Sequence, residues 1–307
     1  MTIQQLEYII ALDTHRHFVR AAEKCFVTQP TLTIQVKKLE EEIGVEIFDR
    51  TKHPVEPTIT GERIILKARS ILREVKGLSE IIQGEKETLE GTFKLGIIPT
   101  MAPYLLPRFL KSFSESYPKT RLVIEELESD SIIDKLLKDE LDIALMSTPL
   151  NETALREVKL FNEPFVVYAD KNHTLRKKRE VKTKDLKRKD LWLLKVGHCF
   201  RNQTLQVCGS SGNHKQIDFE SGSLESIKHL IDTNGGFSLF PALTIDYLIQ
   251  EKEVLRFKDD LPVREVGLVV HHGFAKEALL NALHDSIIQT IPDSFEKMER
   301  YIRVKWR

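Results

Sequence analysis

The most restrictive feature of the sequence lies between Thr60 and Glu90, where apolar residues recur in alternating steps of four and three. This spacing predicts one long helix whose apolar side chains form a single stripe, as in a two-stranded coiled coil. Thr60 is its predicted cap, and Gly91 ends the segment and marks a domain boundary. A partner helix would cover the stripe, so we expect a homodimer held together by Ile64, Ala68, Ile71, Val75, Leu78 and Ile82.

The stripe also has a second interpretation. Ile65, Leu72 and Ile81 widen its apolar face, so the helix could pack on this chain's own core instead of on a second copy. In both cases the helix joins an N-terminal part to a C-terminal part, and 307 residues are enough for two separate cores.

Composition limits the classes of protein to consider. Lys plus Arg and Asp plus Glu each number 46, so the net charge is zero and any electrostatic footprint for DNA must be local. No apolar run is long enough to span a bilayer, and the N-terminus lacks a signal-peptide pattern, so we expect a cytoplasmic protein without membrane contact. A disulfide formed in that reducing compartment is more often catalytic or sensory than structural.

Residues 1–61 follow the pattern of a helix-turn-helix. Helices are predicted at residues 3–12 and 18–25, followed by a third that Thr28 or Gln29 can cap. Pro30 lies in the first turn of the third helix, and Gly44 ends it. The residues from 45 to 60 combine prolines with short apolar pairs and predict a β-hairpin wing.

The third helix has two different faces. Its core-facing stripe is formed by Leu32, Val36, Leu39 and Ile43. Residues 1–60 hold seven Lys or Arg against nine Asp or Glu, so a helical bundle with a solvated polar face is the alternative to DNA binding. The polar face suits base edges and phosphates in a major groove, and it carries Thr31, Thr33, Gln35 and Lys38.

The remaining residues alternate between strand and helix patterns, which predicts an α/β domain with a mainly parallel sheet. Ligands of such sheets bind beyond the carboxyl ends of the strands, which is where Thr100 and Ser129 lie. Predicted strands cover 92–98, 121–127, 141–147, 165–168, 190–195, 237–240 and 266–271, with helices at 104–117 and 130–138.

Residues 197–208 hold two of the three cysteines. A thiol attacks as its thiolate, which neighbouring cationic or hydrogen-bonding groups favour, and His198 and Arg201 lie beside Cys199. If the residues before Cys208 form a helix, the nine-residue step separates the two cysteine Cα atoms by roughly 13 Å. A disulfide would then require this helix to unwind. Two buried cysteines that pack as small apolar side chains are the alternative.

Several stretches resemble LysR-type transcriptional regulators. Residues 1–61, which include Thr28-Gln29-Pro30-Thr31 and Phe48-Asp49-Arg50-Thr51, are similar to the DNA-binding domain of that family. Residues 96–107 and 197–208 are similar to the regulatory domain of its peroxide-sensing members.

The resemblance implies an N-terminal all-α winged helix-turn-helix over residues 1–61 and a linker and dimerisation helix over 62–90. It further implies a C-terminal α/β redox-sensing regulatory domain over 91–307, built from two periplasmic-binding-protein-like lobes. Lobe I would comprise about 91–161 and 266–307, and lobe II about 162–265.

The resemblance further implies a regulator, not an enzyme, that senses hydrogen peroxide and controls oxidative-stress genes. Cys199 would be the peroxidatic thiol and Cys208 the resolving thiol of a thiol/disulfide switch that uses no cofactor or metal. The resemblance assigns the positioning of peroxide and the tuning of the thiolate to Thr100, Ser129, His198 and Arg201. The residues expected to contact DNA are Gln29, Pro30, Thr31, Thr33, Gln35, Lys38 and Arg50.

The implied partners are double-stranded promoter DNA and further copies of the chain, as a dimer or tetramer. RNA polymerase and a thiol reductant of the glutaredoxin or thioredoxin type are also implied. Two other functions compete: a regulator whose cleft binds a small organic effector, and a thiol peroxidase, which would have no need of residues 1–61.

Three further features have simpler interpretations. Residues 171–190 hold ten Lys or Arg against three acids, but we expect a solvated connection and not a DNA contact. His271 and His272 point to opposite faces of a predicted strand and cannot chelate one metal together. Cys25 lies among apolar residues and is expected to be structural.

Overall fold

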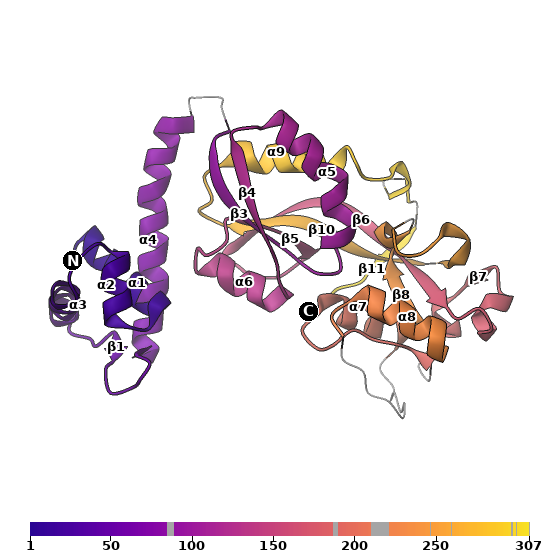
Figure 1. Ribbon diagram of the computed structural model, residues 1–307, viewed down its shortest axis with the longest axis horizontal. Coiled ribbons are helices and arrows are strands. Elements are labelled where there is room, and N and C mark those ends of the chain that lie inside the picture. Colours follow the sequence, from indigo (N-terminus) through magenta and orange to yellow (C-terminus); the bar gives the residue numbers. More distant parts are fainter. Residues whose placement is uncertain are drawn as a thin grey trace. The chain divides into compact units, whose positions relative to one another are not determined.

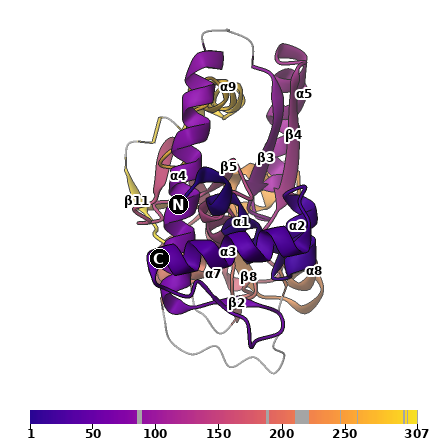
Figure 2. The ribbon, with the colours of Figure 1, turned by 90° about the vertical axis from the view of Figure 1, so that its left-hand side faces the viewer.

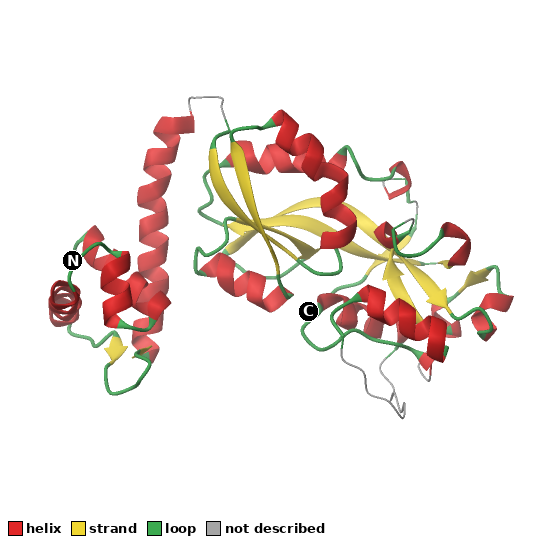
Figure 3. Ribbon diagram, viewed as in Figure 1, coloured by secondary structure: helices red, strands yellow, loops and turns green. Residues whose placement is uncertain are grey.

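The computed structural model describes residues 1–84, 89–186, 190–209, 221–245, 247–258, 260–295, 297–298 and 300–306. They form two compact units, one built mainly from Met1–Glu87 and the other from most of the later residues. The first unit is almost entirely helical, whereas the second mixes strands and helices (Figure 3). Each unit is described by itself below.

The first unit is a helix-turn-helix with a short wing, as predicted. Helices α1 (Ile3–His15), α2 (Phe18–Lys24) and α3 (Gln29–Ile43) precede a two-stranded hairpin of β1 (Phe48–Asp49) and β2 (Glu56–Pro57). These elements surround a common core, and α3 runs across the view in Figure 2.

Local chemistry sets the ends of α3. The Thr28 side chain accepts a hydrogen bond from the Thr31 amide, and Pro30 occupies the first turn. Gly44 ends the helix at φ 69°, a left-handed conformation that glycine adopts without strain. Leu32, Val36 and Leu39 are buried, as their spacing predicts.

Helix α4 (Ile59–Gly84) begins earlier than predicted. Its cap is Thr58, whose hydroxyl accepts from the Gly61 amide at 2.9 Å, and not Thr60, which lies inside the helix. A side chain at Gly61 would collide with the Ile47 carbonyl oxygen, 1.9 Å from an added Cβ. The hairpin therefore packs directly against the first turn of α4.

The apolar stripe of α4 divides between two environments. Ala68 is 2% exposed in the core of the first unit, and Ile64 and Ile71 pack against that core. This part of the stripe follows the alternative interpretation, in which the helix covers its own chain. Val75 is 39% exposed, whereas the side chains of Leu78 and Ile82 lie outside the described residues.

The second unit begins with three parallel strands in the order β4–β3–β5 (Figure 1). They are β3 (Gly91–Ile97), β4 (Thr120–Glu126) and β5 (Ile143–Thr148). Helices α5 (Ala102–Ser116), α6 (Ser129–Leu137) and α9 (Glu277–Ile288) flank them, and α5 packs against α9. The carboxyl ends of all three strands meet at one edge, where the site lies.

The prediction of a mainly parallel sheet is wrong beyond these strands. Strand β10 (Leu261–His271) runs antiparallel to both β5 and β6 (Leu155–Ala169). The sequence predicted only 165–168 of β6, because charged residues and Pro164 interrupt its apolar pattern.

The long strand β6 joins the two lobes. Its first part pairs with β10, and its residues from Phe165 onward pair with β8 (Phe237–Pro241) and β9 (Val254–Phe257). The second lobe also holds β7 (Glu180–Val181), α7 (Cys199–Cys208) and α8 (Leu224–Asn234). A strand was predicted at residues 190–195. These residues instead form only an isolated β-bridge, from Leu191 to Phe237.

The C-terminal residues contact elements of both lobes. Strand β11 (Tyr301–Arg303) pairs with Leu261–Val263 at the start of β10. Beyond it, Val304 and Trp306 are each 5% exposed and hydrogen bond to α7 of the second lobe. Trp306 Nε1 also donates to a carbonyl of β5 in lobe I, so the end of the chain contacts both lobes beside α7.

Candidate redox site and DNA-binding face

Helix α7 has a cysteine at each end. Cys199 is its first residue and Cys208 its last, they are 3% and 9% exposed, and no disulfide joins them. The nine-residue helical step places their Cα atoms roughly 13 Å apart, whereas a disulfide needs about 7 Å or less. The structure therefore contains the dithiol form, and helix α7 itself keeps the thiols apart.

Ser147, near the end of β5, is the polar side chain that contacts the Cys199 sulfur. The Cys199 thiol donates to Ser147 Oγ at 3.7 Å, and Ser147 is fully buried. Its backbone carbonyl accepts a hydrogen bond from Trp306 Nε1 at 3.1 Å. Strand β5 and the C-terminal segment together position this hydroxyl.

Within the described part of the chain, neither predicted thiolate-tuning residue hydrogen bonds to the Cys199 sulfur. Arg201 donates to the Leu194 carbonyl at 2.6 Å. His198 is 5% exposed, and its Nε2 lies 4.0 Å from Glu128 Oε1 without a hydrogen bond. Burial lowers the pKa of His198, an effect that the Glu128 carboxylate opposes and Lys195 reinforces. His198 is thus a neutral imidazole at neutral pH.

Thr100 belongs to a buried polar cluster. Arg264 Nη1 donates to Thr100 Oγ1 at 2.8 Å, and Arg264 Nε donates to Glu163 Oε2 at 2.7 Å. The Arg264 guanidinium also lies over the ring of Phe200, 5.5 Å from its centroid. Since Phe200 follows Cys199, this cluster links Thr100 to the N-terminus of α7.

Ser129 opens α6, just beyond the end of β4. It is 1% exposed, and its Oγ has no hydrogen-bond partner among the described residues. The adjacent Glu128 forms an ion pair with Lys195 at 2.6 Å, which ties this end of lobe I to lobe II. A buried hydroxyl without a partner can bind a small polar molecule.

An open cleft of about 600 Å³ lies between the two lobes. Its lining contains the carboxylates of Glu126, Glu128 and Glu225 together with Lys195 and His198. The lining does not include either cysteine of α7. The cleft and the buried thiol are therefore neighbouring but separate features.

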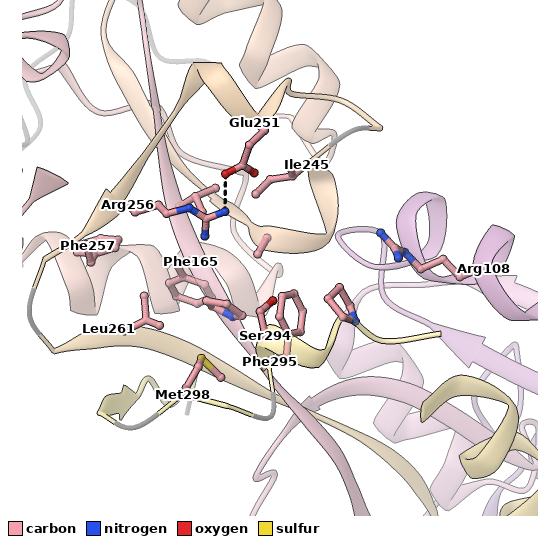
Figure 4. A pocket seen from close by; sticks show the side chains of 14 residues that line it. Arg108, Phe165, Ile245, Glu251, Arg256, Phe257, Leu261, Ser294, Phe295 and Met298 are labelled. Carbon is pink, nitrogen blue, oxygen red and sulfur yellow. Dashed lines mark hydrogen bonds and ion pairs between the residues drawn. The ribbon is translucent and has the colours of Figure 1, made fainter. Parts of the chain in front are cut away.

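A second pocket of about 320 Å³ has an apolar floor and an ion pair at one side (Figure 4). Arg256 and Glu251 form that pair at 2.7 Å. Phe165 contributes to the floor, and its ring packs edge-on against Phe200 with centroids 5.0 Å apart.

The third cysteine, Cys25, belongs to the first unit. Burial and the nearby Glu7 raise the pKa of the Cys25 thiol despite the opposing charge of Lys24, and such a thiol is a poor nucleophile at neutral pH. Among the described residues, no cluster of histidine, cysteine and carboxylate side chains could hold a metal ion, and no helix is long and apolar enough to cross a membrane.

The predicted DNA-reading face of α3 is accessible at its helix start. Gln29, Pro30 and Thr31 are exposed, as is Lys38, whereas Thr33 and Gln35 are half-buried. Gln29 donates to the Thr33 hydroxyl at 3.0 Å, and Gln35 accepts from Gln5 at 3.3 Å.

Arg50, the predicted wing contact, is partly engaged within the chain. Its guanidinium forms an ion pair with Glu40, which is only 8% exposed. The same carboxylate accepts from the amides of Ile47 and Phe48. Arg50 therefore helps to anchor the wing, and 37% of its side chain remains exposed.

This architecture defines a class of DNA-binding transcriptional regulators. Residues 3–62 match the family of bacterial regulatory helix-turn-helix proteins of the LysR family, and residues 86–291 match the LysR substrate binding domain. The chain therefore belongs to the LysR family, whose members are regulators and not enzymes.

Within that family, the chain is similar to OxyR proteins. It is 33% identical to the hydrogen peroxide-inducible genes activator of Pectobacterium carotovorum subsp. carotovorum, over 98% of this chain and 100% of the relative. Full-length OxyR C199D from Pseudomonas aeruginosa matches with a TM-score of 0.80 and 35% identity, covering 94% of each chain. A hydrogen-peroxide-bound cysteine mutant of OxyR from Corynebacterium glutamicum has a TM-score of 0.64 and 26% identity, over 94% and 92% of the chains.

Proposed function

We propose that this LysR-family regulator senses hydrogen peroxide by converting the two thiols of α7 to a disulfide. The observation that carries the proposal is the placement of two buried cysteines, Cys199 and Cys208, at opposite ends of one helix. The similarity to OxyR and to a hydrogen peroxide-inducible activator supports it over the full length of the chain.

The chemistry proceeds in two balanced steps. The Cys199 thiolate attacks one peroxide oxygen; the S–O bond forms as the O–O bond breaks, and the departing hydroxide takes a proton to become water. The Cys208 thiol then attacks the sulfenic sulfur, and a second water leaves as the S–S bond forms. The two sulfurs lose two electrons in total, and one peroxide is reduced.

Thr100 and Ser129 are the proposed positioning groups for peroxide. Thr100 Oγ1 accepts a hydrogen bond from Arg264, so its own hydrogen is available to an external acceptor. The unpartnered Ser129 hydroxyl can donate or accept. Both residues follow parallel strands that end at the edge facing α7.

We further propose that the oxidised protein acts on promoter DNA in the cytoplasm as a dimer or larger oligomer. Residues of the α3 start and of the wing would contact DNA. RNA polymerase, and a glutaredoxin- or thioredoxin-type reductant that resets the disulfide, are the other partners this function requires.

Cysteine variants test the proposal. The wild type and Cys25→Ser should form an intramolecular disulfide with peroxide, measured by mass spectrometry, and should change their promoter binding. Cys199→Ser should do neither, whereas Cys208→Ser should react at Cys199 and show a weakened or transient response. Equal peroxide responses from Cys199→Ser and the wild type would contradict the proposal.

The open cleft supports a second candidate function, the binding of a small organic effector. Its three carboxylates and one lysine favour a polar ligand with a positive group. A thiol-labelling assay separates the two functions, because an effector-only regulator would lose no free thiols in peroxide.

A further inference from the structure

We propose that Ser147 is an additional catalytic residue of the peroxide reaction, acting through the hydrogen bond between its hydroxyl and the Cys199 sulfur. This assignment rests on the proposed function, since it concerns the same thiol. Ser147 was not among the residues that the sequence indicated. It lies near the carboxyl end of β5, whereas Thr100 and Ser129 lie just beyond the carboxyl ends of β3 and β4.

The Cys199 sulfur has little access to solvent. Cys199 is 3% exposed, so water does not solvate a thiolate there, and a buried anion requires donors from the protein. Among the residues that the structure describes, Ser147 Oγ is the side-chain group in hydrogen-bond contact with this sulfur.

The charged groups around the N-terminus of α7 are bonded to partners other than the sulfur. Arg201 is bonded to the Leu194 carbonyl, and the Arg264 guanidinium is bonded to Glu163 and Thr100. His198 is neutral at neutral pH, and the Lys195 ammonium is paired with Glu128. None of these contacts places a cation on the Cys199 sulfur, so the amino end of α7 and the Ser147 hydroxyl are left to favour the anion.

A serine hydroxyl can either accept or donate a hydrogen bond. In the thiol form Cys199 donates and Ser147 Oγ accepts. When the thiol loses its proton, the Ser147 hydroxyl can rotate and donate to the sulfur instead. Backbone pairing of Ser147 with Val266 and the bond from Trp306 to its carbonyl hold the oxygen at that distance in both forms.

The test compares full-length wild type with Ser147→Ala, using the rate of disulfide formation at a series of peroxide concentrations. Loss of a hydrogen bond to a charged group should slow the second-order reaction about tenfold at pH 7. The deficit should shrink at about pH 9, because a higher pH offsets the loss of a group that favours the thiolate. Ser147→Thr, which retains the hydroxyl, should react faster than Ser147→Ala.

Ser238→Ala is the matched control. Ser238 is 4% exposed on strand β8, and its hydroxyl donates to the Trp192 carbonyl. This variant should keep the wild-type rate, and circular dichroism checks the fold of each protein. An unchanged rate in Ser147→Ala, or an equal loss at both pH values, would overturn the assignment while leaving the switch intact. If the wild type formed no disulfide, the proposed function would fail as well.

Discussion

Arg264 is the largest side chain that is completely buried in the described part of the chain. Its charge is balanced by Glu163, which is also 0% exposed and whose second oxygen accepts from the Leu243 amide. Breaking one side of such a pair leaves a buried charge without a partner, which costs more than the intact pair contributes. This cluster joins the two lobes beside the redox helix.

Glu163→Gln should therefore destabilise the regulatory unit by about 3–5 kcal/mol. The matched control is Glu277→Gln, which removes the carboxylate from the more exposed pair with Arg156 and should cost at most about 1 kcal/mol. Urea denaturation of both variants measures these free energies of unfolding. Equal effects of the two changes would show that the buried pair has no special role.

Residues that touch the sulfur were harder to predict than the sulfur itself. Cys199 and Cys208 were recognised because their chemistry is encoded within twelve consecutive residues. Ser147 is 52 positions from Cys199, and Trp306 is 159 positions from Ser147. The local spacing of residues cannot predict contacts between positions so far apart in the sequence. The rule that ligands bind beyond the ends of parallel strands does not identify Ser147 either, because this residue lies within β5.

At the level of elements, helix ends and amphipathic faces were predictable because they depend on neighbouring residues. Thr28, Pro30 and Gly44 define α3 through local hydrogen bonds and backbone geometry. Strand β6 was mostly missed because its environment changes along its length, from the sheet of one lobe to that of the other. One regular spacing of apolar residues therefore does not describe the whole of β6.

Helix α7 is held in place by the C-terminal segment. Asn202 Nδ2 donates to the Trp306 carbonyl and Gln203 Nε2 donates to the Val304 carbonyl, each at 3.1 Å. A disulfide between the ends of α7 requires the helix to unwind, so these bonds would have to break or rearrange. This gives the switch two discrete arrangements instead of a continuous distortion.

At the level of the whole molecule, the exposed part of the α4 stripe provides the surface expected to bind a second copy. Val75→Asp should weaken the dimer, because a charge would enter an apolar seam. Promoter affinity should fall with it, since two DNA-binding domains must bind together. Leu66→Asp, 53% exposed on α4 and outside the stripe, should leave the dimer unchanged. Sedimentation velocity distinguishes these outcomes, and a fully dimeric Val75→Asp would contradict the seam.

The central claim is that disulfide formation refolds α7, and hydrogen exchange before and after peroxide treatment measures this most directly. Mass spectrometry of the same samples would establish that Cys199 and Cys208 are joined. We expect the amides of residues 199–208 to lose protection, while α8 (Leu224–Asn234) of the same lobe keeps its protection. Unchanged protection of α7 in a protein with the disulfide fully formed would contradict the account.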